Sequence, residues 1–114
     1  MKIKDIKELL GAELVCGEGS LDREVMSACG SDMMSDVLAF VKNQAVLLTG
    51  LVNPQVIKTA EMMDMHCIVF VRDKRPTLDM IELAVDADIA LLCTSVRMFE
   101  ACGILYEKGL RGSH

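Results

Sequence analysis

Three apolar runs decide the fold of this chain: AVLLT at residues 45–49, CIVFV at 67–71 and IALLC at 89–93. A run that is apolar at every position is typical of a strand buried on both faces, as in a parallel sheet covered by helices on both sides. The segments between the runs are long enough for a helix each. This pattern predicts consecutive strand–helix units.

Each helix that follows a run has its own predicted start. Asn53 stands before Pro54, which fits the first position of a helix because that position needs no N–H. Thr77 is the predicted N-cap of the next helix. Ser95 is the predicted N-cap of the last helix, and Gly109 is its predicted stop.

The first part of the chain adds shorter elements, because apolar spacing predicts helices over 4–10 and 33–42 and strands over 13–16 and 25–29. Strand–helix units in succession imply right-handed crossovers and a parallel sheet. The predicted fold class is therefore α/β, a three-layer sandwich in which helices flank a mainly parallel sheet of about five strands. Residues 1–110 are predicted to form a single domain, and 111–114 are expected to be a tail derived from a tag.

Composition excludes several classes of protein. The 114 residues carry 12 Lys and Arg against 17 Asp and Glu, a net charge of −5, and the cations are scattered. Nucleic acid is therefore not an expected partner. No apolar run is long enough to span a membrane, and the charged first residues do not form a signal peptide, so we expect a cytoplasmic protein without membrane contact.

The cysteines and histidines offer no recognisable active site. The cysteines are odd in number and form no C-x-x-C pair, which favours reduced, mostly buried thiols: Cys16, Cys29, Cys67, Cys93 and Cys102. His66 is the only histidine outside the expected tail, and in a strand its side chain would point away from that of Cys67. Phosphate-loop, dinucleotide, serine-hydrolase and zinc-protease motifs are absent. We therefore predict no enzyme, no cofactor and no metal.

One pair of carboxylates keeps an enzymatic alternative open. Asp32 and Asp36 lie four residues apart and would share one helical face if the helix began early. Carboxylates placed so can share a proton or hold Mg²⁺. Capping of the first helical turn explains the same residues, since negative charge is favourable there. The alternative is a small phosphotransferase or hydrolase that uses Asp32 or Asp36.

A ligand site is expected beyond the carboxyl ends of the parallel strands, where helix N-termini also point. Hydroxyls, backbone N–H groups and cations follow the three apolar runs and would suit a small anionic ligand. The candidate residues there are Thr49, Gly50, Asn53, Arg72, Thr94 and Ser95. The competing interpretation is that these residues only cap helices or stand in solvated loops.

Methionine is unusually frequent, with nine residues against three Phe and one Tyr. The pairs and triples at Met33–Met34 and Met62–Met65 cannot all face inward, because neighbouring helical residues point about 100° apart. Some of them are therefore expected at the surface, where methionine favours self-association. We expect a homodimer.

Three segments resemble the DRTGG domain family: residues 19–25 (GSLDREV), 31–38 (SDMMSDVL) and 98–106 (MFEACGILY). The resemblance covers about residues 1–110. Asp22 and Arg23 match the start of the motif that names the family, whereas the Thr-Gly-Gly part falls on residues 26–28 and does not match. The Ser-Asp pairs do match, and they join the ligand-binding candidates: Ser31, Asp32, Ser35 and Asp36.

The resemblance implies a regulatory role. Domains of this family stand beside catalytic or sensory modules in HPr kinase/phosphorylase, long phosphotransacetylases and CBS-domain pyrophosphatases, and also occur alone in anaerobic bacteria near iron-only hydrogenase components. This chain is similar to the stand-alone type. The resemblance therefore implies a bacterial, non-catalytic module for dimerisation and ligand sensing. Its implied ligand is a small anionic metabolite or nucleotide, and its implied protein partner is an enzyme. The alternative is a structural adaptor of a redox complex of the hydrogenase type, without a ligand.

Overall fold

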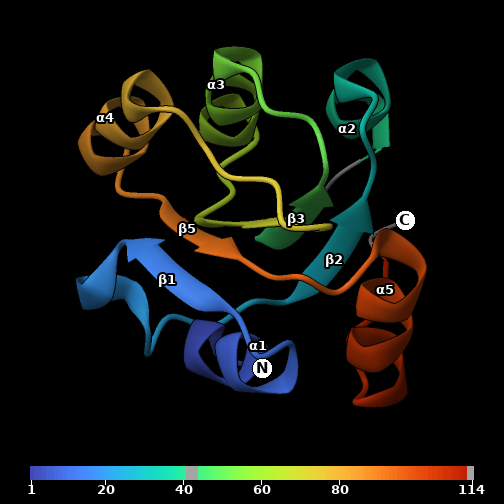
Figure 1. Cartoon of the computed structure of the whole chain (residues 1–114). Helices are drawn as coiled ribbons and strands as arrows, with labels where there is room; N and C mark the ends of the chain where they lie inside the picture. The colour runs from blue at the N-terminus through green and yellow to red at the C-terminus, as the bar shows by residue number, and fades with distance from the viewer. Residues whose placement is uncertain (41–43, 113–114) are drawn as a thin grey trace.

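A five-stranded sheet lies between two layers of helices in the computed structural model, which describes residues 1–40 and 44–112 (Figure 1). The strands, with a 3-10 turn η1 at Glu18–Ser20 after the first, are β1 (Glu13–Cys16), β2 (Ser27–Gly30), β3 (Ala45–Thr49), β4 (Cys67–Phe70) and β5 (Ala90–Cys93). The helices are α1 (Ile3–Leu9), α2 (Met34–Phe40), α3 (Pro54–Met62), α4 (Leu78–Asp86) and α5 (Met98–Glu107).

The sheet confirms the predicted α/β sandwich. Its strand order is β1-β5-β4-β3-β2, in which β2 to β5 run parallel and β1 pairs with β5 in the antiparallel direction. Thr49 is paired with Phe70, and Phe70 with Cys93, so the parallel strands end level with one another. The loops that follow β2, β3, β4 and β5 therefore meet at one edge of the sheet.

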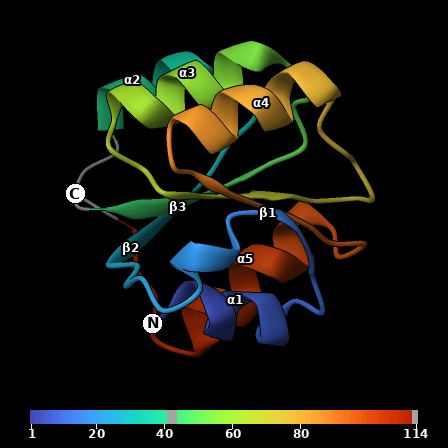
Figure 2. The same cartoon turned by 90° about the vertical axis from the view of Figure 1, so that its left-hand side faces the viewer.

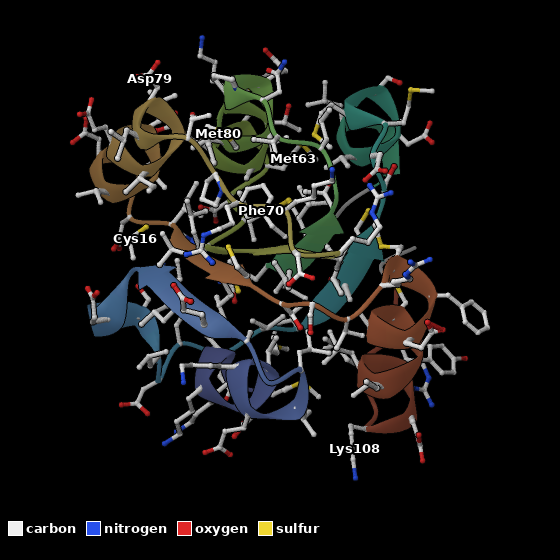
Figure 3. All side chains as sticks on the ribbon, viewed as in Figure 1. Cys16, Met63, Phe70, Asp79, Met80 and Lys108 are labelled. Carbon is white, nitrogen blue, oxygen red and sulfur yellow. The ribbon has the colours of Figure 1, made fainter. Side chains whose placement is uncertain are left out.

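Helices α2, α3 and α4 cover one face of the sheet, and α1 and α5 cover the other (Figure 2). Every residue of β3, β4 and β5 is buried, and successive side chains enter opposite cores. Phe70 packs with Met80 under the α2–α4 layer (Figure 3), whereas Val69 packs with Leu105 on the α1–α5 side. Burial of each large apolar side chain stabilises the fold by about 1.5–3 kcal/mol.

Two of the predicted helix caps are confirmed, and the third is wrong. The Asn53 side chain accepts a hydrogen bond from the Gln55 amide, and the Thr77 side chain accepts one from the Met80 amide. Ser95 does not cap the last helix, which begins at Met98 with Arg97 in the N-cap position. The hydroxyl of Thr94 accepts the Val96 amide instead, so the chain first makes a turn after β5.

Boundaries elsewhere differ little from those predicted. The helix expected over 33–42 is found as α2, and residues 41 and 42 of that prediction lie outside the described residues. Gly109 has a φ of 105° just after α5 and stops the helix as expected, since a left-handed residue there favours glycine.

The methionines divide between core and surface, as predicted. Met65 and Met80 are fully buried, whereas Met33 is 60% exposed and Met62 71% exposed. The five cysteines are free thiols. Among residues 1–40 and 44–112, no helix has the length and apolar character needed to cross a membrane.

Candidate functional site

The carboxylate of Asp32 lies at the centre of a group of polar contacts beyond the ends of β2, β3 and β4. Its Oδ1 accepts a hydrogen bond of 2.7 Å from the Gly50 amide and one of 3.0 Å from the Thr49 hydroxyl. Nη2 of Arg72 lies 3.7 Å from the other oxygen, Oδ2. We call these four residues, Asp32, Thr49, Gly50 and Arg72, the carboxyl-edge cluster.

Asp32 is held in place by the backbone on either side of it. The Ser31 amide donates to the Leu48 carbonyl at 3.0 Å, which continues the contact of β2 with β3 past Gly30. The Ser31 hydroxyl oxygen then accepts the Met33 amide at 2.9 Å. This short turn, a common role of serine before a helix, presents Asp32 to the end of β3.

Arg72 reaches the cluster from an unusual backbone conformation. Arg72 and Asp73 both have a φ of 60°, a left-handed conformation that costs a non-glycine residue about 1–2 kcal/mol. Hydrogen bonds of 3.0 Å from their amides to the carbonyls of Val96 and Thr94 hold this turn against the loop after β5. From this turn the arginine side chain reaches Asp32 and the backbone of Gly50 at the end of β3.

Gly50 allows the guanidinium to lie directly against the backbone. A Cβ atom on Gly50 would be only 2.1 Å from Nη2 of Arg72, so any larger residue would push the guanidinium away. The φ of Gly50 is not in the left-handed region, so the position needs glycine for space and not for conformation. The close approach of an arginine to bare backbone is the feature of this edge that best suits a ligand.

The cluster combines fixed donors with accessible charges. Thr49 is fully buried and Gly50 is buried, whereas the side chains of Asp32 and Arg72 are 54% and 45% exposed. A buried hydroxyl and a backbone amide keep their positions, and a half-exposed arginine is open to solvent and to solutes. Chemically, the donor set suits an anion, since guanidinium, hydroxyl and backbone N–H groups all bind phosphate or carboxylate oxygens.

A separate hollow of about 220 Å³ lies at the same edge of the sheet, and Thr94, Ser95 and Arg75 help to line it. The Thr94 hydroxyl is buried and donates to the Leu10 carbonyl at 2.7 Å, so it is engaged within the fold. Arg75 lies 2.7 Å from a carboxylate oxygen of Glu13, and this hydrogen bond and charge lower the pKa of Glu13. Thr94 and Ser95 are the two predicted ligand-binding residues that line this hollow, and of these two only Ser95 is exposed to solvent.

The remaining predicted residues have local roles or stand apart. The Asn53 side chain is used as a cap. Ser35 and Asp36 lie exposed in the first turn of α2, while Asp32 lies before the helix. The two carboxylates therefore do not share a helical face, which removes the geometry on which proton sharing or Mg²⁺ binding by this pair depended. In the described part of the chain, no group of three or more His, Cys, Asp and Glu side chains is placed to hold a metal.

The pairing of Glu13 with Arg75 is a feature that sequence reasoning missed. It depends on β1 lying antiparallel beside β5, where Glu13 is the partner of Cys93. The two residues are far apart in the sequence. The local sequence of β1 does not indicate that this strand pairs in the antiparallel direction with an otherwise parallel sheet. The acidic start of the β1 segment and the basic turn at residues 72–75 were the only available signals.

No protein-family model and no curated protein matches the sequence. Among solved structures, the chain is similar to the CBS and DRTGG domains of the regulatory region of a Clostridium perfringens pyrophosphatase, solved with its activator diadenosine tetraphosphate. The TM-score is 0.74 at 18% sequence identity, over 91% of this chain and 45% of that one. This chain thus spans less than half the length of that structure. The similarity confirms the expected DRTGG-like fold.

Proposed function

We propose that this chain is a non-catalytic regulatory module that binds a small phosphorylated ligand, a nucleotide or another anionic metabolite, at the carboxyl-edge cluster. One observation carries the proposal: the half-exposed guanidinium of Arg72 lies against the bare backbone of Gly50 at the ends of parallel strands. Ligands of parallel α/β sheets bind at this edge. Arginine is the side chain best suited to phosphate, because its planar donors match the phosphate oxygens.

The structural neighbour supports the same class of function. That protein's regulatory region was solved with a nucleotide activator, and regulation of an enzyme by a nucleotide is the role that we propose here by analogy. The proposed ligand shares the phosphate chemistry of that activator. The proposed partner is an enzyme whose activity the module regulates.

The thiols of the chain also favour a role without catalysis. Burial raises the pKa of all five, and that of Cys67 to about 12. A thiol with a raised pKa is a poor nucleophile near neutral pH, because the thiolate is the reactive form. Asp32, one of the two carboxylates of the enzymatic alternative, already accepts two hydrogen bonds within the cluster through Oδ1.

The test is calorimetric titration of ATP, diadenosine tetraphosphate and inorganic phosphate into the wild-type protein and two variants. Arg72→Gln removes the proposed phosphate ligand, and we expect its affinity to fall about 10- to 100-fold, the usual value of a charged hydrogen bond. Arg23→Gln is the matched control, since the Arg23 guanidinium lies 3.5 Å from the Asp88 carboxylate, outside the cluster. Its affinity should be unchanged.

Three results would contradict the proposal. If none of the three anions binds the wild-type protein, the adaptor without a ligand becomes the better interpretation. If Arg72→Gln and Arg23→Gln bind equally well, the ligand binds elsewhere. Turnover of a phosphate ester that Asp32→Asn abolishes would instead favour the enzymatic alternative.

We also propose that the module acts as a homodimer in the bacterial cytoplasm. Exposed aromatic side chains on α5 support association of two copies, since Phe99 and Tyr106 are both largely open to solvent. A dimer would present two ligand sites to one partner enzyme.

A further inference from the structure

The donors of the carboxyl-edge cluster are already bound to a carboxylate of the protein itself. Asp32 takes the Gly50 amide and the Thr49 hydroxyl through one oxygen and faces Arg72 with the other. These three groups are the anion-binding donors of the cluster at which the proposed function places the ligand. The position of the anion is therefore occupied from within the chain.

We infer that Asp32 is a built-in competitor of the ligand, and that binding displaces its side chain from the cluster. This inference rests on the proposed function and adds how the same site is regulated. Because Asp32 precedes α2, its release changes the turn at residues 31–33 that leads into that helix.

The chemistry of the two anions makes their binding mutually exclusive. An ionised carboxylate only accepts hydrogen bonds, and so does a fully ionised phosphate, so neither can bind the other. Two negative charges at this separation also repel each other. A phosphate that takes the Gly50 amide and Arg72 must therefore replace Asp32.

Burial decides which partner moves. Thr49 is fully buried, and the Gly50 amide is part of the backbone that leaves β3. The Asp32 side chain is 54% exposed, so it can turn out into water without leaving an unpaired buried charge. The donors thus remain in place while the carboxylate leaves.

Displacement has a consequence for the surface beside the site. Met33 follows Asp32, is 60% exposed, and donates its amide to the Ser31 hydroxyl oxygen. A shift of the 31–33 turn would move this apolar side chain. Only molecules in which Asp32 has left the cluster can bind the ligand. The apparent affinity is therefore the intrinsic affinity multiplied by the fraction of molecules in that open state.

The test compares ATP and inorganic phosphate binding to three variants by calorimetry. Asp32→Ala empties the cluster, and we expect affinity to rise about tenfold, equivalent to about 1.4 kcal/mol. Asp32→Asn keeps an acceptor for the Gly50 amide but loses the charge, so a smaller rise is expected. Asp36→Ala removes an equal charge from the first turn of α2 and should change affinity less than about twofold, because an exposed charge outside the cluster is screened.

The outcomes separate this inference from the function on which it rests. Weaker binding by Asp32→Ala would overturn it, because Asp32 would then contact the ligand directly. Equal increases in Asp32→Ala and Asp36→Ala would overturn it as well, since net charge alone would explain them. If the wild-type protein binds none of the anions, the proposed function itself fails. Circular dichroism of each variant establishes that the fold is intact.

Discussion

The geometry of the carboxyl-edge cluster depends on the size of single residues as well as on their charge. Gly50 leaves room for the Arg72 guanidinium, which a Cβ would meet at 2.1 Å. The atom met is the end of a flexible side chain, so a larger residue at 50 moves the arginine and leaves the backbone in place. The site is therefore sensitive to changes that the fold tolerates.

Burial of Cys67 leads to a prediction about stability at high pH. Its pKa is raised to about 12 in the folded state, whereas a thiol in the unfolded chain titrates near its usual value of about 8.5. Above that value the unfolded state loses the proton and the folded state keeps it. The unfolded state is thus favoured, and the free energy of unfolding should fall by up to about 1.4 kcal/mol per pH unit between about pH 9 and pH 12.

Urea denaturation from pH 8 to pH 11 measures this effect. Cys67→Ala should show a shallower fall than the wild-type protein, because other groups titrate equally in both. Parallel curves for the two proteins would show that Cys67 is not responsible.

The residue types at the cluster could be predicted from the sequence, but their contacts could not. Thr49 ends one apolar run, Gly50 follows that run and Arg72 follows the next one. A parallel sheet brings such positions to one edge. The role of Asp32 was obscured by its spacing from Asp36, which fits a helix. Its true partners depend on the hydrogen bond from Ser31 to Leu48, a contact between strands that local spacing does not contain.

Among the elements, the link from β1 into η1 depends on one glycine. Gly17 has a φ of 97°, and a Cβ there would lie 2.6 Å from the Cα of Ala90 at the start of β5. Both the conformation and the backbone contact disfavour a side chain. We predict that Gly17→Ala lowers the free energy of unfolding by about 2 kcal/mol or more.

Gly19→Ala is the control for this change. Gly19 lies two residues further on in η1, and a Cβ would meet nothing within 4 Å. Its unfolding free energy should be unchanged or higher by up to about 1 kcal/mol, because alanine restricts the unfolded chain. Equal chemical-denaturation midpoints for the two variants would contradict the assigned role of Gly17.

Strong local signals gave the elements correctly where the tertiary structure agreed with them. The run at 67–71 became β4, and Asn53 with Pro54 began α3. Ser95 was misassigned because a serine before an apolar stretch has the pattern of an N-cap. The preceding Thr94 hydroxyl accepts the Val96 amide, and the loop is also tied to Arg72, so α5 starts only at Met98. The sequence around Ser95 does not predict those tertiary contacts, so it could not indicate the true start of α5.

At the scale of the whole molecule, the outer face of α5 is the proposed dimer surface. Phe99 and Tyr106 lie seven residues apart on one face, 86% and 58% exposed, with Gly103 between them. The helix lies beside the β2 edge of the sheet (Figure 1). A second copy that covers these aromatics would remove a large apolar area from water.

Sedimentation equilibrium at micromolar concentration tests this surface. We predict a species of twice the 12.5 kDa chain mass for the wild-type protein and a monomer for Phe99→Lys. Leu78→Lys on α4 is the control, since Leu78 is 78% exposed and should leave the dimer intact. A wild-type monomer, or dissociation caused by Leu78→Lys alone, would contradict the assignment.

An anionic ligand is proposed to bind at the carboxyl ends of the parallel strands. The most direct measurement is a titration of ATP into the ¹⁵N-labelled protein, followed by the amide signals in two-dimensional NMR spectra. We expect the largest shifts at Gly50 and Arg72, with accompanying shifts at residues 31–33. No shift at any ATP concentration, or shifts centred on the apolar hollow lined by Gly30 and Cys102 beside α5, would contradict it.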